Sequence, residues 1–432
     1  MANMMNVTCP CCGGSLKFNS QLQKVKCEFC DTEFSVDDLK SYDEELNNKF
    51  EENTEWDESN LDEFSNDENL NVFTCETCGG EVMCDANTTS TRCPYCNNPV
   101  LVGRRLVGGL KPQYIIPFAI EKETAVGNLS GFLKGKILLP SSFKRENKVE
   151  DISGLYVPYW IFDADVDGNA TWNATNVRTW SDSNYTYRET SYYKIIRAGY
   201  IGFEHIPVDA SQKMPDDLME SIEPFDFRGA KEFSTAYITG YCADKYDVSK
   251  ETTFVRATQR IKEGTVDALR GTISHYSTLS LASSAINFKS NTASYAYYPV
   301  WTLNTKYRDK DFKFAINGQT GKLVGNLPMS VPKYVAWFIS MLILFGALGA
   351  GITFGLMSGS DYRIIATIVA GVVVGLLGAF GITFALRRQL RPVRFQHGAA
   401  NYVRSGSFGL TNSKDIFLYK TVTRTAKPKN NK

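Results

Sequence analysis

Cysteines with a repeated spacing are the residues whose types and positions indicate chemistry in this chain. The stretch CPCCGGSLKFNSQLQKVKCEFC begins at residue 9, and CETCGGEVMCDANTTSTRCPYC begins 66 residues later. Each stretch has two CxxC pairs that are separated by fourteen residues. The cysteines that share this frame are Cys9, Cys12, Cys27 and Cys30 in the first copy and Cys75, Cys78, Cys93 and Cys96 in the second. The chain therefore contains an internal repeat of one small module.

A CxxC turn can present two thiolates to one metal ion, and structural Zn²⁺ takes four ligands in a tetrahedral arrangement. Two such turns at the tips of adjacent hairpins predict one structural zinc ion in each module, and thus two ions per chain. Modules this short usually need the metal in order to fold. Redox chemistry or an iron–sulfur cluster would use the same residues, but twice-repeated CxxC pairs at this spacing favour structural zinc. The eight cysteines of the two frames are the predicted ligands.

Three further cysteines lie outside the repeated frame. Cys11 and Cys84 are predicted to be spare thiols, and Cys242 is predicted to be a buried structural cysteine. Ten of the eleven cysteines lie within the first 96 residues, and no signal peptide precedes them. This clustering indicates metal binding in a reducing compartment rather than a disulfide framework.

The formal net charge of zero is an average over two opposite segments. Residues 37–68 carry fourteen acidic and two basic side chains, whereas residues 387–432 carry eleven basic and one acidic. An acidic tether beside the cysteine modules would repel phosphate. Protein contact is therefore predicted for these modules in preference to nucleic-acid contact.

Two long apolar runs predict a membrane hairpin. Residues 335–360 and 364–386 contain no charged side chain, and each run exceeds the roughly 20 residues that a helix needs to cross a bilayer. A buried hairpin in a soluble core is the alternative, which the length of both runs disfavours. The short link forces antiparallel helices, and arginines follow the second run at once, at Arg387, Arg388, Arg391 and Arg394. Both termini are therefore predicted on the cytoplasmic side of the cell membrane.

The region between the modules and the hairpin has the pattern of an α+β domain that is rich in strands. Runs of aromatic and β-branched residues predict strands at 185–206 and 295–324, and a strand pair around an Asp167-Gly168 turn. Apolar spacing predicts helices at 122–136 and 244–269. The predicted organisation has six parts: zinc ribbon 1 (6–36), an acidic linker (37–71), zinc ribbon 2 (72–100), a β-rich α+β soluble domain (110–328), a transmembrane hairpin (331–386) and a basic cytoplasmic tail (387–432).

No enzymatic motif stands out. The three histidines are far apart in sequence, and the GxSxG, HExxH and P-loop patterns are absent from the chain. The sequence therefore predicts a protein that is not an enzyme.

The tandem CxxC modules, the stretches YVPYWIFDADV and GYIGFEHIPVDASQKMPDDLMESIEPFDF, and the apolar hairpin together resemble a family. It is the bacterial TFIIB-type, or primosomal-N′-like, tandem zinc-ribbon membrane proteins. Some similar proteins are encoded beside flotillin-like and phage-shock-like proteins. The resemblance implies zinc ligation by the eight cysteines, and a membrane-stress scaffold with such proteins as partners.

The leading hypothesis is a membrane-anchored, cytosol-facing adaptor or scaffold that recruits proteins to the bilayer and contacts membrane lipid. The alternative is a membrane-tethered zinc-ribbon protein that binds nucleic acid.

Overall fold

The structure is a computed structural model. It describes residues 110–427 except 147–150, 249, 309, 357–362 and 395–397. Of the first 109 residues it describes 9, 16–19, 24–29, 33–35, 56–57, 62–64, 70–85, 90–96, 98–101 and 104–105.

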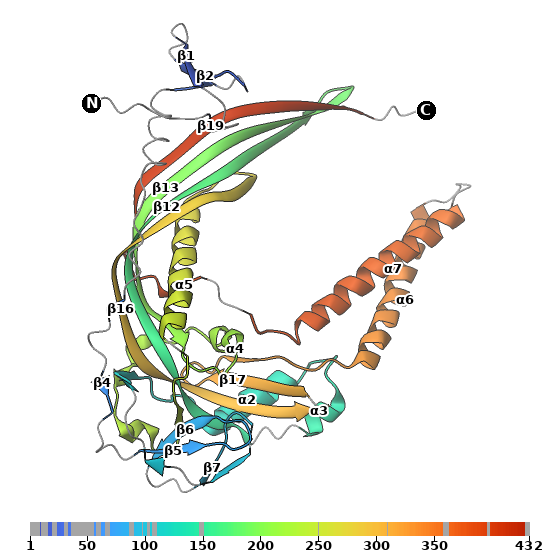
Figure 1. The fold of residues 1–432 in the computed structure, drawn as a ribbon. Helices are drawn as coiled ribbons and strands as arrows, with labels where there is room; N and C mark the ends of the chain where they lie inside the picture. The colour runs from blue at the N-terminus through green and yellow to red at the C-terminus, as the bar shows by residue number, and fades with distance from the viewer. Residues whose placement is uncertain are drawn as a thin grey trace, which may run out of the picture.

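Four long antiparallel strands form the arched sheet on which the molecule is built (Figure 1). Their order is β16-β12-β13-β19, with bounds Thr278–Tyr307, Ser153–Ser181, Tyr185–Asp209 and Gly409–Ala426. The 29 residues of β12 span roughly 95 Å, at ~3.3 Å per residue. The half of β12 nearest its start is buried on both faces, whereas its last residues are exposed. The core therefore lies toward one end of the arch.

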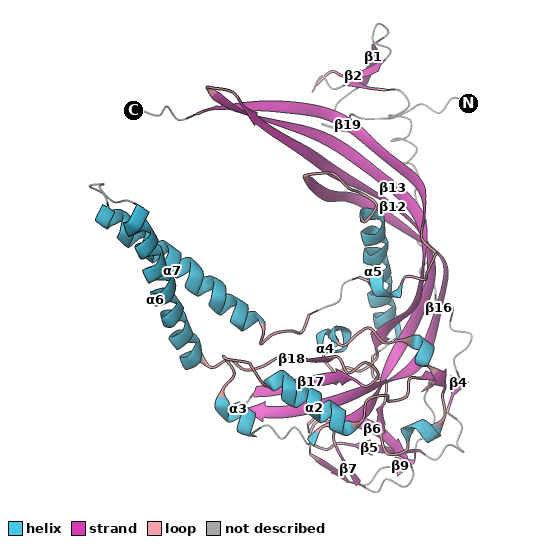
Figure 2. Cartoon of the chain, turned by 180° about the vertical axis from the view of Figure 1, so that it is seen from behind, coloured by secondary structure: helices cyan, strands magenta, loops and turns pink. Residues whose placement is uncertain are grey.

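The helix α5 (Lys250–Arg270) packs against the sheet, as seen in Figures 1 and 2. Its buried side chains Ala257 and Ile261 belong to the core cluster that includes Phe203. The predicted turn at Asp167-Gly168 is wrong, because β12 runs straight through these residues. Gly168 lies where α5 approaches the sheet: a Cβ atom there would be 2.5 Å from Thr265 Cγ2. The glycine thus allows close packing of helix on strand and does not mark a turn.

Shorter elements surround the start of β12. The second cysteine module contributes β5 (Leu70–Thr74), β6 (Glu81–Asp85), β7 (Ser90–Arg92), β8 (Pro99–Leu101) and β9 (Arg104–Arg105). Its strand β6 pairs with β15 (Cys242–Asp244), and β15 pairs with β12. This module is therefore joined to the main sheet.

The first cysteine module forms a separate small sheet of β1 (Leu16–Asn19), β2 (Lys24–Cys27) and β3 (Glu33–Phe34). The remaining short elements are β4 (Asp62–Glu63), β10 (Leu110–Lys111), β11 (Tyr114–Ile115), α4 (Asp216–Ser221), η2 (Phe227–Gly229), β14 (Lys231–Glu232), η3 (Thr235–Ile238) and η4 (Ala400–Tyr402).

The base of the molecule is a cluster of helices and a β-meander. It contains α2 (Lys122–Leu133), α3 (Ser141–Glu146), β17 (Lys310–Asn317) and β18 (Leu323–Gly325). Their apolar side chains share a core cluster with Leu390, and Trp337 packs on it. The predicted helix at 122–136 is confirmed as α2, which ends at Leu133. The helix predicted at 244–269 is confirmed from Lys250 onward as α5, but its predicted start is wrong, because Asp244 ends the strand β15 and residues 245–248 are not helical.

The segment predicted as a basic tail is in part a strand of the arch. Residues 409–426 form β19, which pairs along β13. Its partner strand begins more than 200 residues earlier, so the pairing is a long-range contact that the local sequence does not indicate.

Two apolar helices, α6 (Val331–Leu356) and α7 (Arg363–Arg388), form the hairpin. Both are long and apolar enough to cross a membrane. Only 6% of the most apolar window of α6 and 11% of that of α7 are buried, so most of their apolar side chains face outward. Figure 2 shows the hairpin standing away from the sheet. The two helices are candidate membrane spans.

Glycines hold the two helices together. Gly346 packs against the backbone of Gly371, and a Cβ atom at Gly375 would lie 2.9 Å from the carbonyl oxygen of Leu342. The spacing of Gly351 and Gly355 also suggests a packing face on α6, but nothing lies within 4 Å of a Cβ atom at either position. Small residues at the real contact allow close approach of the backbones.

We predict that Gly375→Leu destabilises the hairpin by about 1–3 kcal/mol, because the added side chain overlaps Leu342. Unfolding of the purified protein in mixed micelles with increasing SDS measures this change. Gly355→Leu is the matched control, since it adds the same side chain in open space. Equal stability of the two variants would contradict this packing.

Candidate metal centre

Two tight turns of the second cysteine module present its four cysteines. In the first turn, the Cys75 N–H donates to the Gly80 carbonyl (2.8 Å) and the Gly79 N–H donates to the Cys75 carbonyl (2.8 Å). Gly79 has a φ of +68°, which favours glycine at this position. In the second turn, the Cys93 N–H donates to the Asn98 carbonyl (2.8 Å). The pairs β5–β6 and β7–β8 lead into these turns and position them.

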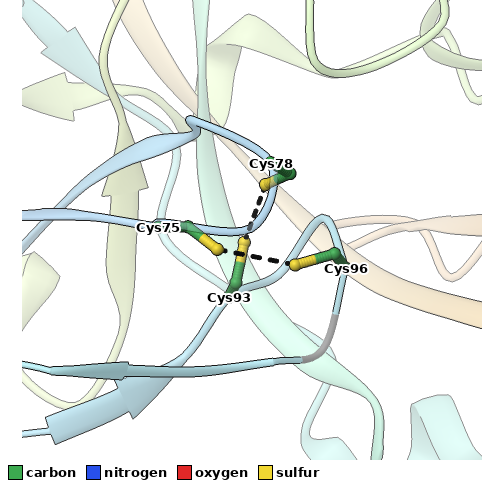
Figure 3. Close-up of side chains that lie close together, drawn as sticks. All are labelled: Cys75, Cys78, Cys93 and Cys96. Carbon is green, nitrogen blue, oxygen red and sulfur yellow. Dashed lines mark hydrogen bonds between the residues drawn. The ribbon is translucent and has the colours of Figure 1, made fainter.

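The four sulfur atoms converge on one point (Figure 3). The Sγ atoms of Cys75 and Cys96 are 3.6 Å apart, as are those of Cys78 and Cys93, and all four lie within 4.8 Å of one another. Four sulfurs placed tetrahedrally at about 2.3 Å from one ion lie about 3.8 Å from one another. The four sulfurs thus lie close enough together for all of them to bind one metal ion.

The four thiols differ in how readily they ionise. Burial raises the pKa of Cys78 and Cys93. Burial also opposes ionisation of Cys75, but hydrogen bonds from the N–H groups of Cys78 and Thr77 outweigh it and lower the pKa of Cys75 to about 7. A metal ion would displace the remaining protons, because thiolates are the ligand form. Metal binding at this site should therefore weaken as the pH falls.

Neighbouring groups support the sulfur cluster. The Asn98 amide donates to the Cys96 sulfur (3.4 Å), and the Lys213 ammonium donates to the Cys78 carbonyl (3.2 Å). Four thiolates around a divalent ion carry a net charge of two minus. The Lys213 ammonium therefore places a positive charge where it offsets this negative charge, as outer partners of metal ligands commonly do.

A buried carboxylic acid lies beneath the second turn. Tyr95, between two of the cysteines, is buried, and so is Asp244 on β15. Burial raises the pKa of Asp244 to about 7. Burial thus favours the neutral form of this carboxyl group.

The first cysteine frame is described only in part. Cys9 and Cys27 are buried, in a cluster with Phe34 that also includes Ile416 and Leu418 of β19. Cys12, Cys30 and the extra Cys11 lie outside the described residues. The prediction of a second ion thus stays a prediction.

Cys84 and Cys242 form a disulfide, which corrects the prediction that Cys84 is a spare thiol. Cys242, predicted to be a buried structural cysteine, is half-buried and bonded to it. The bond also runs against the reducing compartment inferred from the clustering of the cysteines. The two cysteines are direct partners in the pairing of β6 with β15. The bond therefore ties the second cysteine module covalently to β15 of the β-rich domain. Sequence reasoning missed it because the two cysteines are 158 residues apart.

A polar cavity of about 560 Å³ opens beside the sulfur cluster. Cys78 and Cys96 form one wall, and residues 303–306 of β16 lie in the lining. Three lysines and two aspartates also line it: Lys213, Lys306, Lys313, Asp151 and Asp311. The sulfur cluster thus borders a cavity large enough for a side chain or a small ligand.

The fold and the site define an α+β protein with a four-cysteine candidate metal site and two candidate membrane helices. The chain is 32% identical over 335 residues to YdjG, an uncharacterized protein of Bacillus subtilis (strain 168). The match covers 78% of this chain and 93% of the relative. The chain therefore belongs to the YdjG family. No family model and no solved structure matches it.

We predict that Cys93→Ser lowers the metal content of the purified protein by one ion per chain, because a buried ligand is lost. Elemental analysis by plasma mass spectrometry measures the content. The double variant Cys84→Ser/Cys242→Ser is the control, since it removes two cysteines of the same region that are joined in the disulfide. Unchanged metal in the Cys93 variant, or the same loss in the control, would contradict this ligand set.

Proposed function

We propose that the chain is a membrane-anchored adaptor that faces the cytosol and recruits proteins to the bilayer. In this proposal both cysteine modules are zinc ribbons with a structural Zn²⁺ each, and the ribbons contact partner proteins. The sulfur spacing of the second module supports zinc, and the shared sequence frame extends the proposal to the first.

One observation carries the proposal: a single sheet runs from the cysteine module to the strands that pack at the foot of the hairpin. From β6 the pairing continues through β15 and β12 to β16 and β17. The core cluster at β17 also contains side chains next to both apolar helices. A module held in this way keeps a fixed position relative to the membrane anchor, as an adaptor requires.

The cavity beside the sulfur cluster is the contact surface that we propose for a partner. Lys306 is exposed at this cavity, and it is joined there by Lys213 and Lys313. An acidic segment of a protein partner is the complementary chemistry. The resemblance noted from the sequence makes flotillin-like and phage-shock-like proteins the first partners to test.

We expect capture of proteins from gently solubilised membranes to be lost in Lys306→Glu, because the substitution reverses a charge in the cavity. Quantitative mass spectrometry of proteins that co-purify with the full chain is the measurement. Lys134→Glu reverses an exposed lysine that does not line this cavity, and it should capture the same proteins as the wild type. A protein set that disappears after nuclease treatment would instead support the nucleic-acid alternative.

The topology is a second part of the proposal, with both termini cytoplasmic. The Leu327 N–H donates to the Leu390 carbonyl (2.9 Å), so the chain enters and leaves the hairpin at one place. Arg387, Arg388 and Arg391 follow at this end, which supports the cytoplasmic side.

A membrane-impermeant thiol reagent on intact cells should label a cysteine at Ser360, in the segment between the two apolar runs, and not one at Ser405. Ser405 is exposed in the structure, so a missing label there reports the membrane barrier and not burial. Peptide mass spectrometry after lysis separates these sites from native cysteines. Labelling at Ser405 would show that the C-terminal part of the chain lies outside the cytoplasm, and it would contradict the proposal of a cytosolic adaptor.

A further inference from the structure

A second cavity, of about 320 Å³, lies at the base of the membrane hairpin. It is bounded by the β16–β17 connection, by the segment that enters α6, and by the end of α7 with the residues that follow it. The lining residues of the first two parts are Tyr307, Arg308, Lys310, Phe312, Leu327, Pro328 and Met329, and those of the last part are Arg387, Leu390 and Arg391. Three separate parts of the chain thus build one site.

The cavity is strongly basic. Arg308 and Lys310 line it from the β16–β17 connection and the start of β17, and Arg387 and Arg391 line it from the end of α7 and the residues just after it. All four are exposed, and none of the described lining residues is a carboxylate. Asp309 lies outside the described residues. Four cations that converge on a space of this size are suited to a phosphate group.

The other lining residues are apolar and lie next to the hairpin. Leu327 and Leu390 join the two chain segments by a backbone hydrogen bond, with Met329 beside them. Trp337 and Tyr334, at the start of α6, pack against the core cluster that contains Leu327 and Leu390. Tryptophan and tyrosine are enriched at the level of the lipid headgroups. This end of the hairpin therefore lies at the membrane interface when α6 and α7 span the bilayer.

We propose that this cavity binds the phosphate headgroup of an anionic phospholipid from the leaflet on the side of the soluble domain. The four cations bind the phosphodiester. The apolar lining residues, such as Leu327, Met329 and Leu390, contact the glycerol and the first part of the acyl chains. Basic pockets beside transmembrane helices bind anionic headgroups in this way. The inference rests on the proposed membrane anchoring, and it adds a specific lipid site to that function.

Arginines after a membrane helix can also set its orientation in the membrane and interact favourably with the helix dipole, without binding any one lipid. The chain offers a matched control for this role. Arg388 and Arg394 lie in the same segment as Arg387 and Arg391 and are exposed, but they do not line the cavity. Removing either pair takes away the same charge from the same end of α7.

The experiment measures binding of the first phosphatidylglycerol molecule to the full chain by native mass spectrometry in detergent, with phosphatidylcholine for comparison. We expect Arg387→Gln/Arg391→Gln to weaken phosphatidylglycerol binding about 30-fold, which corresponds to ~1 kcal/mol for each cation. Arg308→Gln/Lys310→Gln should weaken it to a similar degree from the opposite wall. Arg388→Gln/Arg394→Gln should bind as the wild type does.

An equal loss in the Arg388/Arg394 control would overturn the site, because it would show general electrostatic attraction. Displacement of phosphatidylglycerol by an equal concentration of inorganic phosphate would also overturn it, in favour of a soluble phosphate ligand. Carbonate washing of membranes separates the two proposals. A wild-type chain that washes off refutes the membrane anchor, whereas a retained chain without preference for phosphatidylglycerol refutes the lipid site alone.

Discussion

Antiparallel pairing of β12 with β16 is the constraint on which the other contacts depend. The pairing runs from Ser153 with Thr302 to Thr175 with Thr278, along most of both strands. The other edge of β12 pairs with two strands: Leu155 and Tyr156 pair with β15, and the residues from Tyr159 onward pair with β13. Other regions are attached to this pair: the second cysteine module reaches it through β15, and β17 pairs with both β16 and β18, the strand that precedes the apolar hairpin. A shift of register by one residue would exchange the side chains that β12 presents to its two faces and would disrupt the packing on which both attachments depend.

Buried charges fix the helices to this sheet. The Arg260 guanidinium on α5 contacts the Glu223 carboxylate at 2.7 Å, and the Tyr402 hydroxyl donates to the same carboxylate at 2.7 Å. Arg260 and Glu223 are almost completely buried, and removal of one partner would leave the other charge without compensation. Tyr402 belongs to the segment between α7 and β19. The network thus connects the chain that leaves the hairpin to the core beneath α5.

The sequence predicted the features that depend on local spacing. The CxxC frame identified the four sulfurs that the structure brings together, because each pair of ligands lies within one turn. The apolar runs identified the two helices for a similar reason. The Cys84–Cys242 bond, the β19 strand and the role of Gly168 were not predictable in this way. Each of them depends on a partner far away in sequence, and a glycine within a strand resembles a turn residue until the helix that approaches it is known.

The β16–β17 hairpin lies between the two cavities. Alternate side chains of β17 line one cavity or the other. Asp311 and Lys313 line the cavity beside the sulfur cluster, whereas Lys310 and Phe312 line the cavity at the base of the membrane helices. Successive residues of a strand point to opposite faces. One short strand therefore sets the position of the candidate metal centre relative to the proposed lipid site. Lys310 and Lys313 thus belong to one strand but face different cavities.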